Sequence, residues 1–582
     1  MALHSTAARL TRPWRELTDR ERRRALLAGA MLLALAAQIP AWMWVVDDAG
    51  ISFSYARSLA EGHGLVAQPG AERVEGYSNP LWVVLLSLWE LAGVGGFVAS
   101  KVMGVVFGMA CIPLVWRIAR WSRPDRDEMV PLLAAYALAL NAIFAIWNTS
   151  GLENSLFNVL LAAGAWRVLV EIRTRGFPWS GLLFAGVALT RPEGALYALA
   201  AGAAAAIFAR ADGRGRRPAY VWLLVFGVPF LAVRAASFHY FAWPLPNTYY
   251  AKLSGVIAAP LDWSGRGWTY LRAFAGWSFR PDSPGPGLGF GSFLPLFVLG
   301  AVGSRGWRGR VAGGLLAALL AALWLPLPED GQALRVIALG ALTASVPFLA
   351  ADRPGGRALA LCWLMAGVSI LFTLQASGDW MHGYRWMSLL AVPTSVLFAA
   401  GVGELRDALG RSWRAARVSR SAVLAPLALA VWVVPQLRHL AWFTWDAPIG
   451  VTTVRHRVDY VHDLMDTLHL EEATVLDVDM GAALYWSRTQ LVDLVGLIDV
   501  PMARHPRSPA FYDEYLFRER RPEFAHVHGS WIEKSRIAES SEWREQYLPL
   551  PGYLTPHGTV HTGEFVRRDL LFSPDWRGQP GL

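Results

Sequence analysis

Two adjacent carboxylates, Asp47 and Asp48, stand directly after a long apolar run of the sequence. That run, from Arg24 to Val46, has the roughly twenty residues that one helix needs to cross a bilayer. A carboxylate at the mouth of a membrane span is costly to desolvate, so it often has a function there. The pair could act as a general base or help to hold a divalent cation. A solvated helix end is the alternative for the pair taken alone.

Several further polar motifs follow the Asp pair in a fixed order. They are Tyr55-Ala-Arg-Ser-Leu-Ala-Glu-Gly-His63-Gly-Leu, Arg73-Val-Glu75-Gly-Tyr77-Ser-Asn-Pro-Leu-Trp82, Thr149-Ser-Gly-Leu-Glu153, Thr190-Arg191-Pro-Glu193-Gly, Pro246-Asn247-Thr-Tyr249-Tyr-Ala-Lys252 and Gly378-Asp379-Trp380-Met-His382-Gly-Tyr-Arg385. Together these motifs resemble the GT-C superfamily, integral-membrane glycosyltransferases that use polyprenyl-phosphate sugars. Within it the chain most resembles the terminal β-(1→2)-arabinofuranosyltransferases of mycobacterial cell-wall assembly, whose relatives also carry the name flagellar motor control protein.

The resemblance implies a reaction and a role for each Asp. The expected reaction moves a sugar, arabinofuranose by resemblance, from a polyprenyl-phosphate donor to a cell-envelope glycan by an inverting mechanism. Asp47 is the expected general base, because the family places its catalytic carboxylate in this first loop. Asp48 is expected to orient it, bind donor hydroxyls or help to hold a divalent cation. Which of the two is the base stays open, and no cofactor is certain.

The other candidates divide by chemistry into two groups. Cations stabilise a leaving phosphate, and the donor-phosphate candidates are Lys252, Arg385, His382, Arg191 and the neighbouring Asp379. Polar and aromatic groups hold two sugars in line, and the substrate candidates are His63, Glu75, Tyr77, Glu193, Asn247, Tyr249 and Trp380. Simpler roles remain for some of them. Arg385 could reach to the interface, Glu193 could only pair with Arg191, and aromatic residues gather at membrane surfaces without any ligand.

Composition identifies a membrane protein. Of 582 residues, 54% are hydrophobic and 17% are charged, against roughly 25% charged residues in a soluble domain. The net charge of +9 could indicate a nucleic-acid partner. Most Arg residues, however, fall in short loops between apolar runs, as membrane orientation signals do. We therefore expect membrane lipids, the lipid-linked donor and the glycan acceptor as partners, and no nucleic acid. Cys111 and Cys362 lie inside apolar runs, so we expect neither a disulfide nor a thiol metal site.

The positions of the Arg residues predict the topology. Seven Arg residues in residues 1–24 predict a cytoplasmic N-terminal segment. Residues 25–438 are expected to form the transmembrane GT-C module, with about 11–13 helices and a first extracytoplasmic loop at 47–96. Within that loop Pro80 to Val94 is expected to be an interfacial helix. The alternation places every candidate residue on the extracytoplasmic side of the plasma membrane, the expected location of this multi-pass protein.

Residues 439–582 differ in composition and predict a separate extracytoplasmic α/β domain. Ala473 to Asp479 and Leu491 to Leu497 are typical of strands, and a helix is expected to begin near Met480. The resembled family carries similar Asp-x-Gly and Asp-Leu-x-Gly-Leu patterns in its tail. The domain could roof the site, hold the acceptor, or only stabilise the fold.

The predicted fold class is an α-helical polytopic membrane protein of GT-C fold with a C-terminal extracytoplasmic α/β domain. Two functions of other classes compete with a transferase. A lipid-linked sugar transporter should carry polar groups at mid-membrane depth, whereas the candidates here are predicted on one face. A non-catalytic envelope or flagellar motor-associated membrane protein would not need the Asp pair or the cationic motifs.

Overall fold

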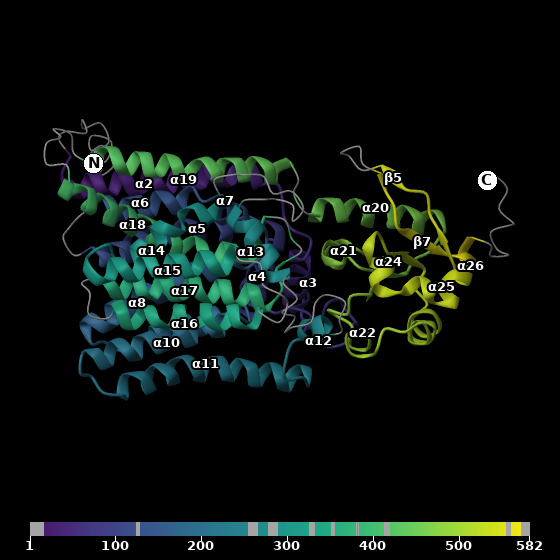
Figure 1. The fold of residues 1–582 in the computed structure, drawn as a ribbon. Helices are drawn as coiled ribbons and strands as arrows, with labels where there is room; N and C mark the ends of the chain where they lie inside the picture. The colour runs from purple at the N-terminus through teal and green to yellow at the C-terminus, as the bar shows by residue number, and fades with distance from the viewer. Residues whose placement is uncertain are drawn as a thin grey trace, which may run out of the picture.

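Helices make up most of the chain, and a small sheet lies near its C-terminal end (Figure 1). The structure is a computed structural model. It describes residues 17–123, 128–253, 266–276, 289–324, 332–350, 355–379, 381, 383–412, 420–445, 447, 449–554 and 560–571. Two regions are distinct in the ribbon: a bundle of long helices, and a mixed region beyond its right-hand end.

The helices of the bundle follow one another with short connections. In chain order they are α2 (Asp19–Gln38), α3 (Ala49–Ala60), α4 (Pro80–Leu91), α5 (Gly96–Ser122), α6 (Met129–Ala139), α7 (Ala142–Asn148), α8 (Asn154–Thr174), α9 (Ser180–Thr190), α10 (Gly194–Ala211), α11 (Arg217–Phe241), α12 (Asn247–Leu253), α13 (Arg266–Gly276), α14 (Leu294–Val302), α15 (Gly306–Trp324), α16 (Gln332–Ala350), α17 (Gly356–Gln375), α18 (Ala391–Ser412) and α19 (Arg420–Trp445). Short 3₁₀ segments follow α2 and lead into α14 and α18.

The predicted polytopic membrane fold is confirmed. Within the described residues, eight helices are long and apolar enough to cross a membrane, or nine if the bent pair α6 and α7 forms one span. The predicted 11–13 crossings exceed this number. Several of the expected spans form helices too short to cross alone, since α9 has 11 residues and α14 has 9. Helix α4, with 12 residues, is also too short to span.

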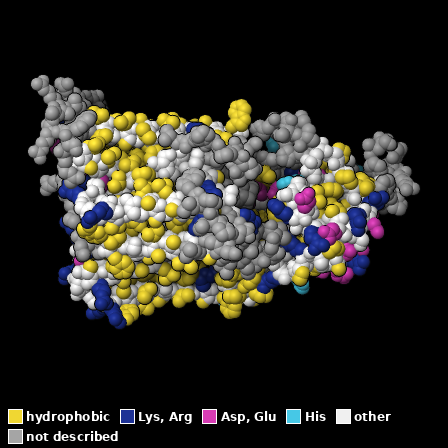
Figure 2. All heavy atoms as spheres, viewed as in Figure 1, with side chains coloured by type: hydrophobic (Ala, Val, Ile, Leu, Met, Phe, Trp, Pro, Cys, Tyr) yellow, Lys and Arg dark blue, Asp and Glu magenta, His cyan; other side chains and the backbone are white. Residues whose placement is uncertain are grey.

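Lys and Arg side chains gather at one end of the bundle (Figure 2). Helix α2 begins at the left-hand end in Figure 1, and the sheet lies beyond the right-hand end. Figure 2 shows dark blue Lys and Arg side chains at the left-hand end and yellow apolar side chains along the sides. Ion pairs join neighbouring helices, including Arg123 after α5 to Asp407 of α18 at 2.8 Å and Arg357 of α17 to Asp212 after α10 at 2.6 Å.

The C-terminal region is the predicted α/β domain, and its sheet is mixed. The strands are β1 (Thr474–Asp477), β2 (Gln490–Asp493), β3 (Phe524–His526), β4 (Tyr547–Pro549) and β7 (Glu564–Arg567), in the order β2-β1-β3-β7-β4. The first three are parallel, and β7 is antiparallel to β3 and β4. Strands β5 (Tyr553–Leu554) and β6 (Val560–His561) form a separate two-stranded sheet. The helices are α20 (Val451–Thr467), α21 (Gly481–Trp486), α22 (Val500–Arg504), α23 (Pro509–Tyr512), α24 (Ser530–Ser535), α25 (Ser541–Gln546) and α26 (Arg568–Leu571), with a π-helical turn η6 (Asp513–Arg520).

Alternate residues of the sheet enter two different cores, as the two-residue period of a strand requires. Val475 and Leu491 belong to the core that is continuous with the helix bundle. Leu476 and Val492 belong to a second core inside the domain. The sheet thus anchors the domain to the membrane module through one face and stabilises the domain itself through the other.

Candidate functional site

The Asp47-Asp48 turn is held between two distant segments of the chain. The N–H of Val46 donates to the carbonyl of Ser150 at 3.0 Å, and Val46 also forms a β-bridge with Gly450. Buried Lys101 donates to the carbonyl of Trp44 at 2.6 Å and to that of Thr149. These backbone contacts fix the direction in which each Asp side chain leaves the turn.

Asp47 points into the C-terminal domain. Its Oδ2 accepts a hydrogen bond from the N–H of Gly481 at 2.9 Å, and its Oδ1 accepts one from Ala482 at 2.8 Å. The residue is 4% exposed. Burial, followed by the charge of Asp479, raises the pKa of Asp47 well above its usual range. Both oxygens are therefore engaged in joining the first loop to the start of α21.

Two glycines allow this approach. A Cβ atom on Gly481 would lie within van der Waals overlap of the Asp47 carbonyl, and one on Gly50 would overlap the Gly481 carbonyl. A side chain at either position would push α3 and α21 apart, because the atoms that its Cβ would meet belong to the backbone and cannot rotate away. Gly50 therefore belongs to the docking contact.

Asp48 points the other way, toward the end of the helix bundle. Its side chain is 38% exposed, and its Oδ2 lies 4.0 Å from Nη1 of Arg385. Burial raises the pKa of Asp48 to about 6, against the lowering effect of Arg385. The charges of Asp379 and Asp479 raise the same pKa, and Lys252 lowers it. A reachable carboxylate with this pKa can exchange a proton near neutral pH.

Arg385 is oriented by Asp379. Its Nε lies 2.8 Å from Oδ2 of Asp379, whose side chain is only 3% exposed. Lys252 reaches solvent, yet protein surrounds it closely enough that burial, and then the charge of Arg385, lower its pKa. We call Asp48, Asp379, Arg385 and Lys252 the Asp48 cluster. The four come from the first loop, α12 and the segment before α18, so the structure brings together residues that are far apart in sequence.

Arg191 is paired within the bundle. Its Nη1 lies 2.7 Å from Glu153, its Nε donates to Glu193, and all three side chains are buried. Glu153 also accepts a hydrogen bond from Asn79 at 2.7 Å. Arg191 and Glu193 thus connect the α9–α10 turn to the start of α8 and, through Glu153, to Asn79 of the first loop.

Three more candidates join the first loop to its surroundings. Glu75 pairs with Arg234 at 2.9 Å, and burial raises the pKa of its carboxyl against the effect of that guanidinium. The Tyr77 ring packs edge-on against Tyr55 at 4.8 Å. Asn247 donates through Nδ2 to the carbonyl of Gly496 at 2.8 Å.

The Asp-Leu-x-Gly-Leu pattern of the domain explains the Asn247 contact. Asp493 accepts hydrogen bonds from the N–H groups of Val495 at 2.7 Å and Ile498 at 2.9 Å. These bonds form a tight turn at Gly496, whose φ is +85°. The carbonyls of this turn accept hydrogen bonds from Asn247 of α12, and these bonds hold the domain against the membrane module.

The last four candidates lie outside the cluster or outside the described residues. His63 is nearly half exposed and faces Glu61 at 3.8 Å. Tyr249 is 43% exposed and contacts the ring of Tyr250. Trp380 and His382 lie outside the described residues.

Sequence reasoning did not single out a second polar cluster, formed by Asp479, His526 and His528. We call it the Asp479 cluster. Its only sequence signal is a His-x-His pair at the end of a short strand, where residues two apart share a face. The Asp that completes the group precedes the pair by about fifty residues in sequence, since 479 and 526 are that far apart.

Comparisons with known proteins bear on the fold. A family model described as a domain of unknown function (DUF8728) matches residues 453–571. No curated protein matches the sequence. Among solved structures, the chain is similar to the oligosaccharyltransferase AglB of Archaeoglobus fulgidus in complex with an inhibitory peptide and a dolichol-phosphate, with a TM-score of 0.51 and 12% identity over 93% of this chain and 74% of that one.

The apo form of the Archaeoglobus fulgidus oligosaccharyltransferase gives a TM-score of 0.50 at 13% identity over the same shares of the two chains. ArnT of Cupriavidus metallidurans bound to undecaprenyl phosphate gives 0.43 at 14% identity, over 93% of this chain and 96% of that one. The likeness to the oligosaccharyltransferase confirms the predicted GT-C fold. The resemblance to arabinofuranosyltransferases stays a prediction.

Proposed function

We propose that this protein is a membrane glycosyltransferase that moves a sugar from a polyprenyl-phosphate donor to a glycan acceptor. The observation that carries the proposal is the half-exposed Asp48 carboxylate opposite Arg385, at the end of the bundle where the C-terminal domain docks. The shared fold with an oligosaccharyltransferase whose structure holds a dolichol-phosphate supports a polyprenyl-type donor.

In this proposal Asp48, rather than Asp47, is the general base. The acceptor hydroxyl oxygen attacks the anomeric carbon, and Asp48 takes the hydroxyl proton as the new carbon–oxygen bond forms. The bond from the anomeric carbon to the phosphate oxygen breaks, and its electron pair leaves with the polyprenyl phosphate. Asp48 is chosen because its carboxylate is reachable and its pKa is about 6, whereas both oxygens of Asp47 accept backbone hydrogen bonds.

Arg385 and Lys252 would stabilise the leaving phosphate. The planar guanidinium of Arg385 can grip two phosphate oxygens, and the ammonium of Lys252 acts as a point charge. Asp379 is a positioning residue here, since it holds Nε of Arg385 at 2.8 Å and leaves the two terminal nitrogens for the ligand.

The identity of the sugar and of the acceptor rests on the sequence motifs. Arabinofuranose and a cell-envelope glycan are proposed on that resemblance, with plasma-membrane placement and the site on the extracytoplasmic side. The Arg-rich end of the bundle supports this orientation, because loops rich in Arg stay on the cytoplasmic side.

The orientation can be tested by thiol labelling of intact cells. Cys111 and Cys362 are buried, so they give little background. Ser530→Cys, at an exposed position of the domain, should react with a membrane-impermeant maleimide. Arg216→Cys, at an exposed position of the opposite end, should react only after the membrane is permeabilised. The reverse pattern would contradict the orientation.

The reaction can be tested with purified protein in proteoliposomes. The substrates are a synthetic polyprenyl-phosphate arabinofuranose and a short arabinan acceptor, and the products are followed by mass spectrometry. A transferase extends the acceptor by one sugar and releases polyprenyl phosphate, and Asp48→Asn should not. Movement of intact donor across the bilayer would instead indicate a transporter. Neither extension nor movement, with any polyprenyl-phosphate sugar, would support a non-catalytic protein.

A further inference from the structure

The Asp479 cluster lies at the carboxyl edge of two parallel strands of the domain. Asp479 follows β1, His526 ends β3, and His528 comes two residues later. One ligand atom from each of the three lies within 4.8 Å of the others. Loops that leave the carboxyl ends of adjacent parallel strands meet at one edge, which is where such sheets commonly bind ligands.

The distances within the cluster suit a bound cation. His528 Nε2 lies 2.8 Å from Oδ2 of Asp479, and His526 Nε2 lies 3.7 Å from the same oxygen. Two ligands of a tetrahedral Zn²⁺ at their usual bond lengths are about 3.3 Å apart. Movements of about half an ångström therefore bring each imidazole nitrogen to the separation from Oδ2 of Asp479 that two zinc ligands have, well within ordinary side-chain freedom.

A carboxylate behind His526 orients its ring. Nδ1 of His526 lies 3.0 Å from Oε1 of Glu564, and both residues are buried. When the imidazole is neutral and Nδ1 donates to Glu564, Nε2 carries no proton and presents its lone pair beside Asp479. A carboxylate that holds the outer nitrogen of a histidine in this way is the usual neighbour of a metal-bound imidazole.

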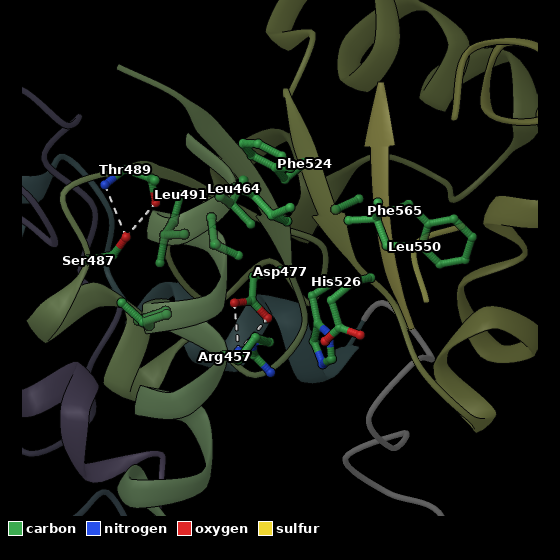
Figure 3. Close-up of a pocket in the computed structure, with 16 residues that line it drawn as sticks. Arg457, Leu464, Asp477, Ser487, Thr489, Leu491, Phe524, His526, Leu550 and Phe565 are labelled. Carbon is green, nitrogen blue, oxygen red and sulfur yellow. Dashed lines mark hydrogen bonds and ion pairs between the residues drawn. The ribbon is translucent and has the colours of Figure 1, made fainter. Parts of the chain in front are cut away.

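The groups around the cluster carry an excess of two negative charges when its imidazoles are neutral. Arg457 binds both oxygens of Asp477, at 3.0 and 2.8 Å, and Figure 3 shows these two side chains beside His526 in the cavity between α20 and the sheet. Arg457 also donates to the backbone carbonyl of Asp479, but its guanidinium is 3.8 Å from the Asp479 carboxylate. Three carboxylates, of Asp477, Asp479 and Glu564, thus face one guanidinium, which leaves two negative charges when the imidazoles are neutral. A divalent cation balances them.

We propose that Asp479, His526 and His528 bind a divalent metal ion of the Zn²⁺ type. Two imidazole nitrogens and one carboxylate suit Zn²⁺ and its transition-metal neighbours, whereas Mg²⁺ and Ca²⁺ take oxygen ligands. Three protein ligands leave a fourth position for water or for an oxygen of a substrate. The site is distinct from the Asp48 cluster, and the proposal does not depend on the transferase activity.

The metal would also stabilise the contact between the domain and the first loop. Asp479 stands two residues before Gly481, whose N–H holds Asp47. Fixing Asp479 on a metal fixes the backbone that receives Asp47. Metal binding is therefore expected to raise the melting temperature of the full chain, since a ligand that binds only the folded state stabilises it.

The test uses the full-length protein in detergent, freed of metal with a chelator and then titrated with ZnCl₂, MnCl₂ or MgCl₂. Zn²⁺ should bind at one equivalent per chain, raise the melting temperature, and bind more tightly than Mg²⁺. His528→Ala and Asp479→Asn should remove this binding, and Glu564→Gln should weaken it by roughly 10- to 100-fold. His456→Ala, an exposed histidine of α20, is the matched control and should leave the binding unchanged.

A second measurement needs no variant. Co²⁺ bound to the unmodified protein should give the intense visible absorption of a four-coordinate site, and Zn²⁺ should abolish it. The proposal is overturned if the unmodified chain binds no Zn²⁺, if it prefers Mg²⁺, or if binding survives both His528→Ala and Asp479→Asn. Loss of sugar transfer with intact Zn²⁺ binding would count against the proposed function alone.

Discussion

The Asp48 cluster belongs to the membrane module and the Asp479 cluster to the C-terminal domain, and the two are built in different ways. The first gathers side chains from three distant segments of the membrane module and leaves Asp48 reachable by solvent. The second is formed within one sheet edge, and its buried His526 contacts carboxylates through both ring nitrogens. Charges that stay reachable suit a reaction that repeats, whereas buried ligands held in place by their neighbours suit an ion that stays bound.

The adjacent residues Asp47 and Asp48 each contact one of these two regions. Asp47 faces the domain, where two backbone N–H groups satisfy it. Asp48 faces the cations of the membrane module. Identical side chains one residue apart therefore have different environments.

The largest expected effect divides the Asp pair by activity. Asp48→Asn keeps the shape of the side chain and removes its basicity, so turnover should fall by roughly 10²- to 10⁴-fold while the donor still binds. Asp47→Asn, the matched control, should retain far more of the turnover. The measurement is kcat and KM for donor and acceptor in both variants. A larger loss of kcat in Asp47→Asn would return the base to Asp47.

The next effect concerns the grip on the phosphate. Arg385→Ala should weaken donor binding by about 10- to 100-fold, since a hydrogen bond to a charged group contributes about 1.5–3 kcal/mol. Arg385→Lys should restore only part of it, because the planar fork is lost. Arg234→Lys alters an ion pair at the same end of the bundle but outside the cluster, and should leave donor affinity unchanged. Equal donor affinity in Arg385→Ala and the unmodified protein would remove Arg385 from the site.

A smaller effect concerns the docking of the domain. Asp47→Ala removes the acceptor of two buried backbone N–H groups, which should cost about 1–3 kcal/mol of stability. The melting temperature should fall, and a protease should cleave between α19 and α20 more readily. Asp48→Ala is the control, because its side chain accepts no backbone hydrogen bond from the part of the chain that the structure describes. An unchanged melting temperature in Asp47→Ala would mean that other contacts carry the docking.

The sequence predicts the fold class, the α/β domain and the residues of the Asp48 cluster. These follow from apolar runs, Arg positions and ordered motifs, which are local signals. The division of labour between Asp47 and Asp48 could not be predicted, because it depends on Gly481, a residue 434 positions away. The Asp479 cluster was missed for the same reason, since strand pairing in space joins β1 to β3.

The smallest effect is a shift in the pH dependence. If Asp48 is the base, it must be ionised, so kcat should fall as the pH drops through about 6, the pKa of this carboxyl, and level off above it.

Asp379→Asn removes a charge that raises this pKa and frees Arg385 to lower it further. The acidic limb should therefore move to lower pH. Lys252→Met removes a charge that lowers the pKa, so it should move the limb to higher pH. Glu61→Gln, in the exposed part of the first loop, should leave the limb in place. Opposite shifts in the two variants identify Asp48 as the titrating group, and a limb that stays fixed in both assigns it to another residue.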